Sequence, residues 1–129
     1  IENLAAQIIG ISSALDFENM VIRIGDGAPL SRDRIINDCL THQLEIEVVN
    51  EAKTSRGLLR HNHVISAIRI AMISGERVWE FRELQPTEGE VREIQRQSRK
   101  KSNGRKTISS QMAYAVACGD LTLEEAIER

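Results

Sequence analysis

Residues 19–50 read NMVIRIGDGAPLSRDRIINDCLTHQLEIEVVN, and this stretch decides the class of fold. The segment 19–25 is short and rich in β-branched side chains, which predicts a strand. The glycines that follow, up to Pro29, predict a turn because glycine adopts positive φ without strain. Ser31 is then placed to cap a helix that continues to about His42.

A change of period predicts a second strand over residues 43–50. Three aliphatic residues alternate there with two glutamates, so that one face is apolar and the other meets water. These residues are Leu44, Ile46 and Val48, with Glu45 and Glu47 between them. A strand, a helix and another strand in this order indicate an α/β fold.

The elements on either side of this stretch follow from helical and strand periods in the same way. Residues 2–15 predict an amphipathic helix, residues 58–74 a strongly apolar helix that ends at Gly75, and residues 77–84 a third short strand. Because it is so apolar, we expect the helix over 58–74 to be the central packing element. Its stripe consists of His61, Val64, Ile65, Ile68 and Met72, widened by Ile70 and Ile73.

Helices alone are predicted after Pro86. Thr87 and Glu90 have the spacing of a capping box, which begins a helix that continues to about Ser102. A turn at Asn103 follows, then helices over about 108–118 and 123–129. The predicted fold is therefore α/β, a small three-stranded sheet packed by helices in the order αβαβαβ, with a helical C-terminal extension. We expect residues 1–85 to form the α/β domain and residues 86–129 the extension, within one folding unit.

Composition limits the classes of function. The net charge of −2 gives no general attraction to nucleic acid or to an anionic membrane, and aromatic residues make up only 3%. Cys39 and Cys118 fit no metal-ligand spacing and are predicted to be free, buried thiols, which favours a reducing, cytoplasmic setting. No apolar run is long enough to cross a bilayer, so we expect no membrane insertion. Because the chain starts at Ile1 and stops at Arg129 inside a predicted helix, we expect it to be an ordered fragment of a longer protein.

Patterns that would indicate catalysis or cofactor binding are missing from the sequence. The turn over residues 25–29 lacks the glycine and Lys-Ser/Thr pattern of a phosphate loop. His61 and His63 lie two positions apart, so on a helix they point to opposite sides and cannot share a metal. We expect no metal, no cofactor and no self-contained catalytic site. An enzyme would need a cleft built from distant residues such as Asp26, Arg60, His61 and Trp79.

The most unusual local feature is a basic stretch between residues 92 and 106. Seven of the 17 Lys and Arg residues of the chain lie there, and Glu93 is the one acid among them. They are Arg92, Arg96, Arg99, Lys100, Lys101, Arg105 and Lys106. Such a stretch can bind phosphates or an acidic protein surface, but charge runs of this kind are also commonly just solvated.

The last twenty residues resemble the C-terminal tail of the pilus and secretion traffic ATPases. The matching positions are Gln111, Tyr114, Gly119, Leu121, Thr122, Glu124, Glu125 and Ala126. The phosphate loop and the histidine and acid boxes of that family do not occur in this chain. The resemblance therefore implies no ATPase activity, and at most an accessory or docking role for the same helical hairpin.

Two classes of function stay open from the sequence. The first is a non-enzymatic interaction or assembly module of a larger bacterial complex, which binds a protein partner through the basic stretch and the terminal hairpin. The alternative is a nucleic-acid-binding protein that contacts phosphates with the same stretch and uses the helices over 108–118 and 123–129 as a helix-turn-helix. The acids Glu124 and Glu125 stand against it, because they begin the helix that would enter the groove. A homo-oligomer is compatible with either.

Overall fold

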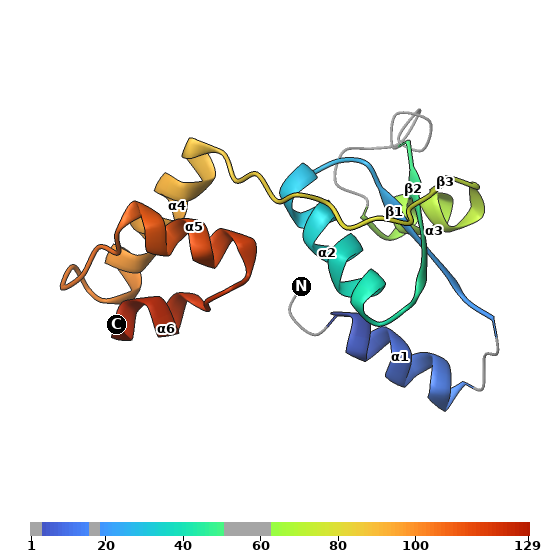
Figure 1. Ribbon diagram of the computed structural model, residues 1–129, viewed down its shortest axis with the longest axis horizontal. Coiled ribbons are helices and arrows are strands. Elements are labelled where there is room, and N and C mark those ends of the chain that lie inside the picture. Colours follow the sequence, from blue (N-terminus) through green and yellow to red (C-terminus); the bar gives the residue numbers. More distant parts are fainter. Residues whose placement is uncertain (1–3, 16–18, 51–62) are drawn as a thin grey trace. The chain divides into compact units, whose positions relative to one another are not determined.

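The computed structural model describes residues 4–15, 19–50 and 63–129, and Figure 1 shows its elements in order. The chain divides into two compact units, Ile1–Arg82 and Glu83–Arg129. Within the described ranges, no helix combines the length and apolar character that a bilayer span requires.

The first unit is a small α/β structure, as the sequence predicted. Its described helices and strands alternate along the chain, and a mixed three-stranded sheet lies among them. They are α1 (Leu4–Ala14), β1 (Val21–Gly25), α2 (Pro29–Thr41), β2 (Glu45–Val49), α3 (His63–Met72) and β3 (Glu76–Arg77).

The sheet has the strand order β1-β2-β3 among the described residues. β1 and β2 run parallel, with Val21 opposite Glu45 and Gly25 opposite Val49, whereas β3 pairs antiparallel to β2. Figure 1 shows α2 and α3 on opposite sides of this sheet. α2 connects β1 to β2. A parallel pair needs a crossover of this kind, because the chain must return to the same end of the sheet before the second strand starts.

The core of the first unit lies on the α2 side of the sheet. Ile36 and Cys39 from α2 pack there with Ile46 from β2, and all three are fully buried. Ala5 in α1 and Val78 complete the buried cluster. The aliphatic residues of the alternation predicted over 43–50, Leu44, Ile46 and Val48, face this core, because successive side chains of a strand point to opposite faces.

The predicted cap of α2 was wrong by three residues. The helix begins at Pro29, preceded by Ala28 with φ of 44°, and no side chain caps it. Proline is favoured at the first helical position because its φ is already helical and the missing N–H has no intrahelical acceptor there. Ser31 consequently lies inside the first turn.

The expectation that α3 is the central packing element was also wrong. None of its described side chains is buried, and Val64 and Met72 are 70% and 78% exposed. The centre of the sheet face on the α3 side carries the charged pair Arg23 and Glu47 instead of apolar side chains that the stripe could cover. His61, assigned to the same stripe, lies outside the described residues.

The third strand is much shorter than the predicted range of 77–84. Only Glu76–Arg77 is strand, followed by one more ladder contact in which the Val78 N–H donates to the Ile46 carbonyl at 2.9 Å. Further on, the Asn37 side chain on α2 takes both backbone groups of Arg82, with contacts of 2.9 and 2.7 Å. The chain therefore leaves the sheet, and Trp79 and Phe81 are 74% and 64% exposed.

The second unit is a bundle of α4 (Glu88–Lys101), α5 (Ser110–Cys118) and α6 (Leu123–Glu128). The predicted capping box is confirmed, because Thr87 and Glu90 bond reciprocally at the start of α4. Gly119 ends α5 in the left-handed conformation, with φ of 84°. Ile108, Ala113 and Ala126 form the buried core, so the bundle has an apolar cluster of its own.

Side-chain hydrogen bonds hold the turn between α4 and α5. Ser98, fully buried, donates to the Gln95 carbonyl at 2.6 Å and accepts the Ile108 N–H at 3.1 Å. Ser102 lies 2.9 Å from both the N–H and the carbonyl of Lys106. Because these serines take the polar groups of the returning chain, the turn folds back onto the last two turns of α4.

Candidate functional site

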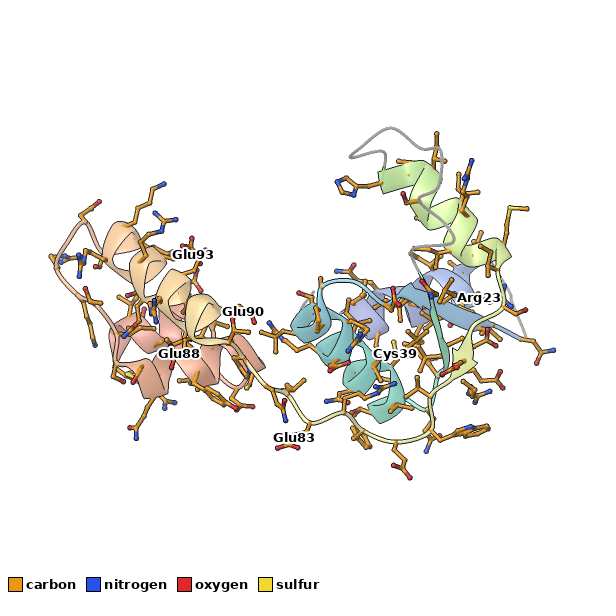
Figure 2. The ribbon with its side chains drawn as sticks, turned by 90° about the horizontal axis from the view of Figure 1, so that it is seen from above. Arg23, Cys39, Glu83, Glu88, Glu90 and Glu93 are labelled. Atoms are coloured by element: carbon orange, nitrogen blue, oxygen red, sulfur yellow. The ribbon has the colours of Figure 1, made fainter. Side chains whose placement is uncertain are left out.

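Three of the seven basic residues predicted as a binding site are paired with carboxylates of the same unit, at its surface. Arg92 contacts Glu88 at 3.1 Å, and both residues lie on the first half of α4. Arg96 binds Glu93 through two contacts, of 2.8 and 2.6 Å. Lys101 pairs with Glu124 of α6. Figure 2 labels Glu88, Glu90 and Glu93 along α4.

The Arg96 pair has an electrostatic consequence. The side-chain hydrogen bond from Arg96 lowers the pKa of the Glu93 carboxyl, and the same bond raises the pKa of the Arg96 guanidinium. Both groups therefore stay charged over a wider pH range than they would alone. Their mutual contact reduces what Arg96 can offer to a partner.

The other four basic residues have no carboxylate at ion-pair distance in the part of the chain that the structure describes. Arg99 donates instead to the Thr107 hydroxyl at 3.0 Å, and Arg105 donates to the Ser102 carbonyl at 3.2 Å. We call this group the basic end of the bundle: Arg99, Lys100, Arg105 and Lys106.

The fold brings the basic end together from two segments. Ser102 Oγ lies 3.2 Å from the Arg99 carbonyl and 2.9 Å from the Lys106 N–H, so the last turn of α4 and the returning chain are adjacent. Asn103 and Gly104, with φ of 56° and 82°, make this reversal. The helix dipole favours cations in the last turn of α4, which accounts for Arg99 and Lys100. It does not account for Arg105 and Lys106, which lie beyond the helix.

A groove of about 680 Å³ on the same bundle was not foreseen from the sequence. It runs between the first half of α4 and α5, where Pro86, Val91 and Tyr114 supply apolar walls. The Tyr114 hydroxyl donates to the Leu84 carbonyl at 3.4 Å. The remaining lining residues are Glu88, Arg92, Gln95, Ser110 and Gln111. Helical spacing predicts that Val91 and Gln95 lie on one side of α4. It does not predict that α5 packs beside that side and completes the groove.

The residues named for a possible enzyme are not shown to form a cleft. Asp26 follows β1 and lines a pocket of about 430 Å³ with Ser74 and Glu76. Trp79 is elsewhere, with the Arg77 guanidinium 4.2 Å from its ring centre. Arg60 and His61 lie outside the described residues. In the described ranges, no three His, Cys, Asp or Glu side chains gather as metal ligands would.

The carboxylates of Glu124 and Glu125 at the start of α6 both have partners in the same unit. Glu124 pairs with Lys101, and the Thr122 hydroxyl donates to the Glu125 carboxylate at 3.2 Å. Leu123 and Ile127 pack against the buried core, so this side of α6 is occupied. α6 is also only six residues long.

Comparison with known proteins found a similar domain for the bundle but none for the rest of the chain. A family model described as a three helical bundle domain matches residues 87–129, the range that contains α4, α5 and α6. No curated protein matches the chain, and no solved structure does. The C-terminal third of this chain is thus similar to a three helical bundle domain.

Proposed function

We propose that the chain is a non-enzymatic interaction module of a larger assembly, and that the basic end binds an acidic surface of a protein partner. The observation that carries this proposal is the division of the seven basic residues. Three are paired with carboxylates of the same unit, whereas the other four lie on two adjacent segments and have no carboxylate at ion-pair distance in the described residues.

Charge balance favours an acidic protein over nucleic acid as the partner. Residues 83–129 contain eight acidic and eight basic residues, so the basic end is a local patch on a neutral unit. Non-specific nucleic-acid binding usually draws on many phosphate contacts or on aromatic stacking. Tyr114 is the single aromatic residue of this segment. A patch of four cations matches the smaller charge of an acidic protein surface.

The test compares two classes of probe on one protein. Fluorescence anisotropy is measured with a labelled polyglutamate peptide and with random-sequence duplex DNA, single-stranded DNA and RNA, at about 50 and 200 mM salt. We expect binding of the acidic peptide, and weak or no binding of the nucleic acids. The variant Arg99→Gln/Lys100→Gln/Arg105→Gln/Lys106→Gln should lose about tenfold or more of the peptide affinity.

A matched control removes an ion pair from the same helix and keeps all four cations of the basic end. Glu93→Gln/Arg96→Gln deletes one internal ion pair at constant net charge, so it should leave peptide binding unchanged. Equal loss in both variants, or no loss in the fourfold variant, would show that the basic end is not the interface.

The alternative partner is nucleic acid bound through the same four cations. It would be favoured by micromolar binding that falls about two decades or more between the two salt concentrations, since each phosphate contact adds to the salt dependence.

The resemblance of residues 110–129 to traffic ATPase tails fits a docking role for the α5–α6 hairpin beside the basic end. That resemblance stays a prediction.

A further inference from the structure

α3 is attached to the sheet with little burial of its side chains. It is ten residues long, and none of its side chains is fully buried. Ser66 and Ile70 within the helix, and Ile73 just after it, are half-buried. An isolated helix of this length is marginal in water, and most helices in proteins are stabilised by burying an apolar face. Contacts other than buried apolar side chains must therefore help to hold α3 against the sheet.

Arg23 and Glu47 provide such contacts from the centres of β1 and β2. Arg23 Nη1 donates to the Ala71 carbonyl in the last turn of α3 at 2.5 Å, and its Nε contacts Glu47 Oε1 at 3.1 Å. The Gly75 N–H donates to the same Glu47 oxygen at 2.9 Å. One ion pair thus holds both the end of α3 and the turn after it, and Figure 2 labels Arg23 at this place.

The turn is shaped to reach this pair. A Cβ added at Gly75 would lie 2.3 Å from the Val48 carbonyl oxygen, a distance that no side chain tolerates. Glycine here lets the backbone approach β2 closely enough for its N–H to reach Glu47. The close approach and the ion pair are parts of one arrangement.

The surrounding charges keep Glu47 ionised. Arg23 faces it from β1 and Arg77 from β3, while Glu45 engages Arg77 at 3.2 Å. The Gly75 N–H, followed by Arg23, lowers the pKa of the Glu47 carboxyl. The residues of α3 with ionisable side chains are His63 and Arg69, neither of which is acidic.

We infer that α3 and the turn at Gly75 form a detachable segment, whose attachment to the sheet is controlled by the Arg23–Glu47 ion pair. Neutralising Glu47 removes the ion pair that anchors Arg23, the residue that holds Ala71, and leaves the Gly75 N–H with an uncharged, weaker acceptor. The segment then opens locally while α2 and its buried core remain folded, because local opening follows the regions with few buried contacts. This inference does not depend on the function proposed for the basic end.

Hydrogen exchange of the full chain tests the inference residue by residue. In Glu47→Gln, the amides of residues 67–75 should exchange about tenfold faster or more than in the unchanged protein. Those of α2 should keep their rates. Glu45→Gln is the matched control, since Glu45 lies two positions away on the same strand and pairs with Arg77 rather than with α3.

Three results would overturn the inference. They are unchanged exchange in residues 67–75 of Glu47→Gln, an equal rise in α2, and an equal effect of Glu45→Gln. If Glu47→Gln does not fold, Arg23→Lys is measured in the same way, because it retains the positive charge but loses the planar fork. A rise confined to residues 67–75 supports the detachable segment, and any other pattern rejects it.

Discussion

The two cysteines differ in environment although the sequence made them look alike. Cys39 is fully buried in the α2 core, where burial, followed by the charge of Asp38, raises the pKa of its thiol to about 11. Cys118 near the end of α5 is only partly buried. Neither cysteine forms a disulfide, as predicted, but only Cys39 meets the expectation of full burial.

Thiol labelling should separate the two residues. Because the thiolate is the reactive form, alkylation of the native protein at roughly pH 8 should modify Cys118 and spare Cys39 until denaturant is added. Mass spectrometry of the digested protein measures this directly. Cys118→Ser should leave almost no native reactivity, and rapid labelling of Cys39 in that variant would contradict the buried position of this thiol.

Ser98 is the polar residue on which the bundle depends most. It is fully buried, and its hydroxyl accepts the N–H of Ile108, which is itself 2% exposed. Ser98→Ala would leave that N–H without a partner, and we expect a loss of about 1–3 kcal/mol in the free energy of unfolding. Denaturant titration followed by exchange of the α4 and α5 amides measures it. Ser110→Ala, on an exposed residue, should change stability far less.

At the scale of elements, the attachment of α3 should depend on pH. The pKa of Glu47 is below its ordinary value of 4.5 in the folded protein, so its ionised form stabilises the folded state. That contribution is complete above the ordinary carboxyl pKa and is lost as pH falls through the lower, folded value. We therefore expect the protection of α3 amides, corrected for intrinsic exchange, to fall on acidification below about pH 4.5.

The same pH series on Glu47→Gln isolates this carboxyl from the others. The variant should show a flat profile for residues 67–75 over the range in which the unchanged protein loses protection. If both profiles fall together, another carboxyl such as Glu45 is responsible, and the acid sensitivity of α3 does not arise from the Arg23–Glu47 pair.

Elements with local signals were predicted well, and those without were not. The capping box of Thr87 and Glu90 spans four residues, and it is confirmed. The strand predicted over 77–84 was wrong because the Asn37 amide, which binds Arg82, comes from a helix 45 positions away. Strand propensity cannot register such a competing partner.

At the scale of the molecule, the two units should fold separately. The segment 83–129 has its own buried cluster and its own caps, and a three helical bundle domain model matches residues 87–129. We expect a fragment of residues 83–129 to show a helical circular dichroism spectrum and a cooperative thermal transition. A segment of this size is near the lower limit for independent folding, so its stability should be low.

A core substitution makes that experiment specific. Ala126→Asp places a carboxylate at a fully buried position and should abolish the transition of the fragment. Glu128→Ala, on an exposed residue of the same helix, should preserve it. A fragment that is unfolded without either substitution would show that residues 1–82 are required for the bundle.

The sequence predicted the candidate site only as a basic stretch. The structure shows which of its seven basic residues are paired with carboxylates. Spacing alone offers Glu88 to Arg92 and Glu93 to Arg96, because residues three or four apart are neighbours on a helix. The pairing of Lys101 with Glu124 joins residues 23 positions apart. Which cations remain for a partner therefore depends on how α6 packs against α4.

The sequence by itself determined the α/β class, the order of the elements and most of the helix ends, because period, caps and turn residues act within a few positions. Tertiary structure decided which apolar stripe enters the core. The predicted stripe of α3 stays exposed, since the sheet face on its side carries Arg23 and Glu47, whereas Ile36 and Cys39 of α2 meet an aliphatic face. It also decided which basic residues gather at the end of the bundle. Burial and ion pairing depend on distant residues, and no local pattern contains them.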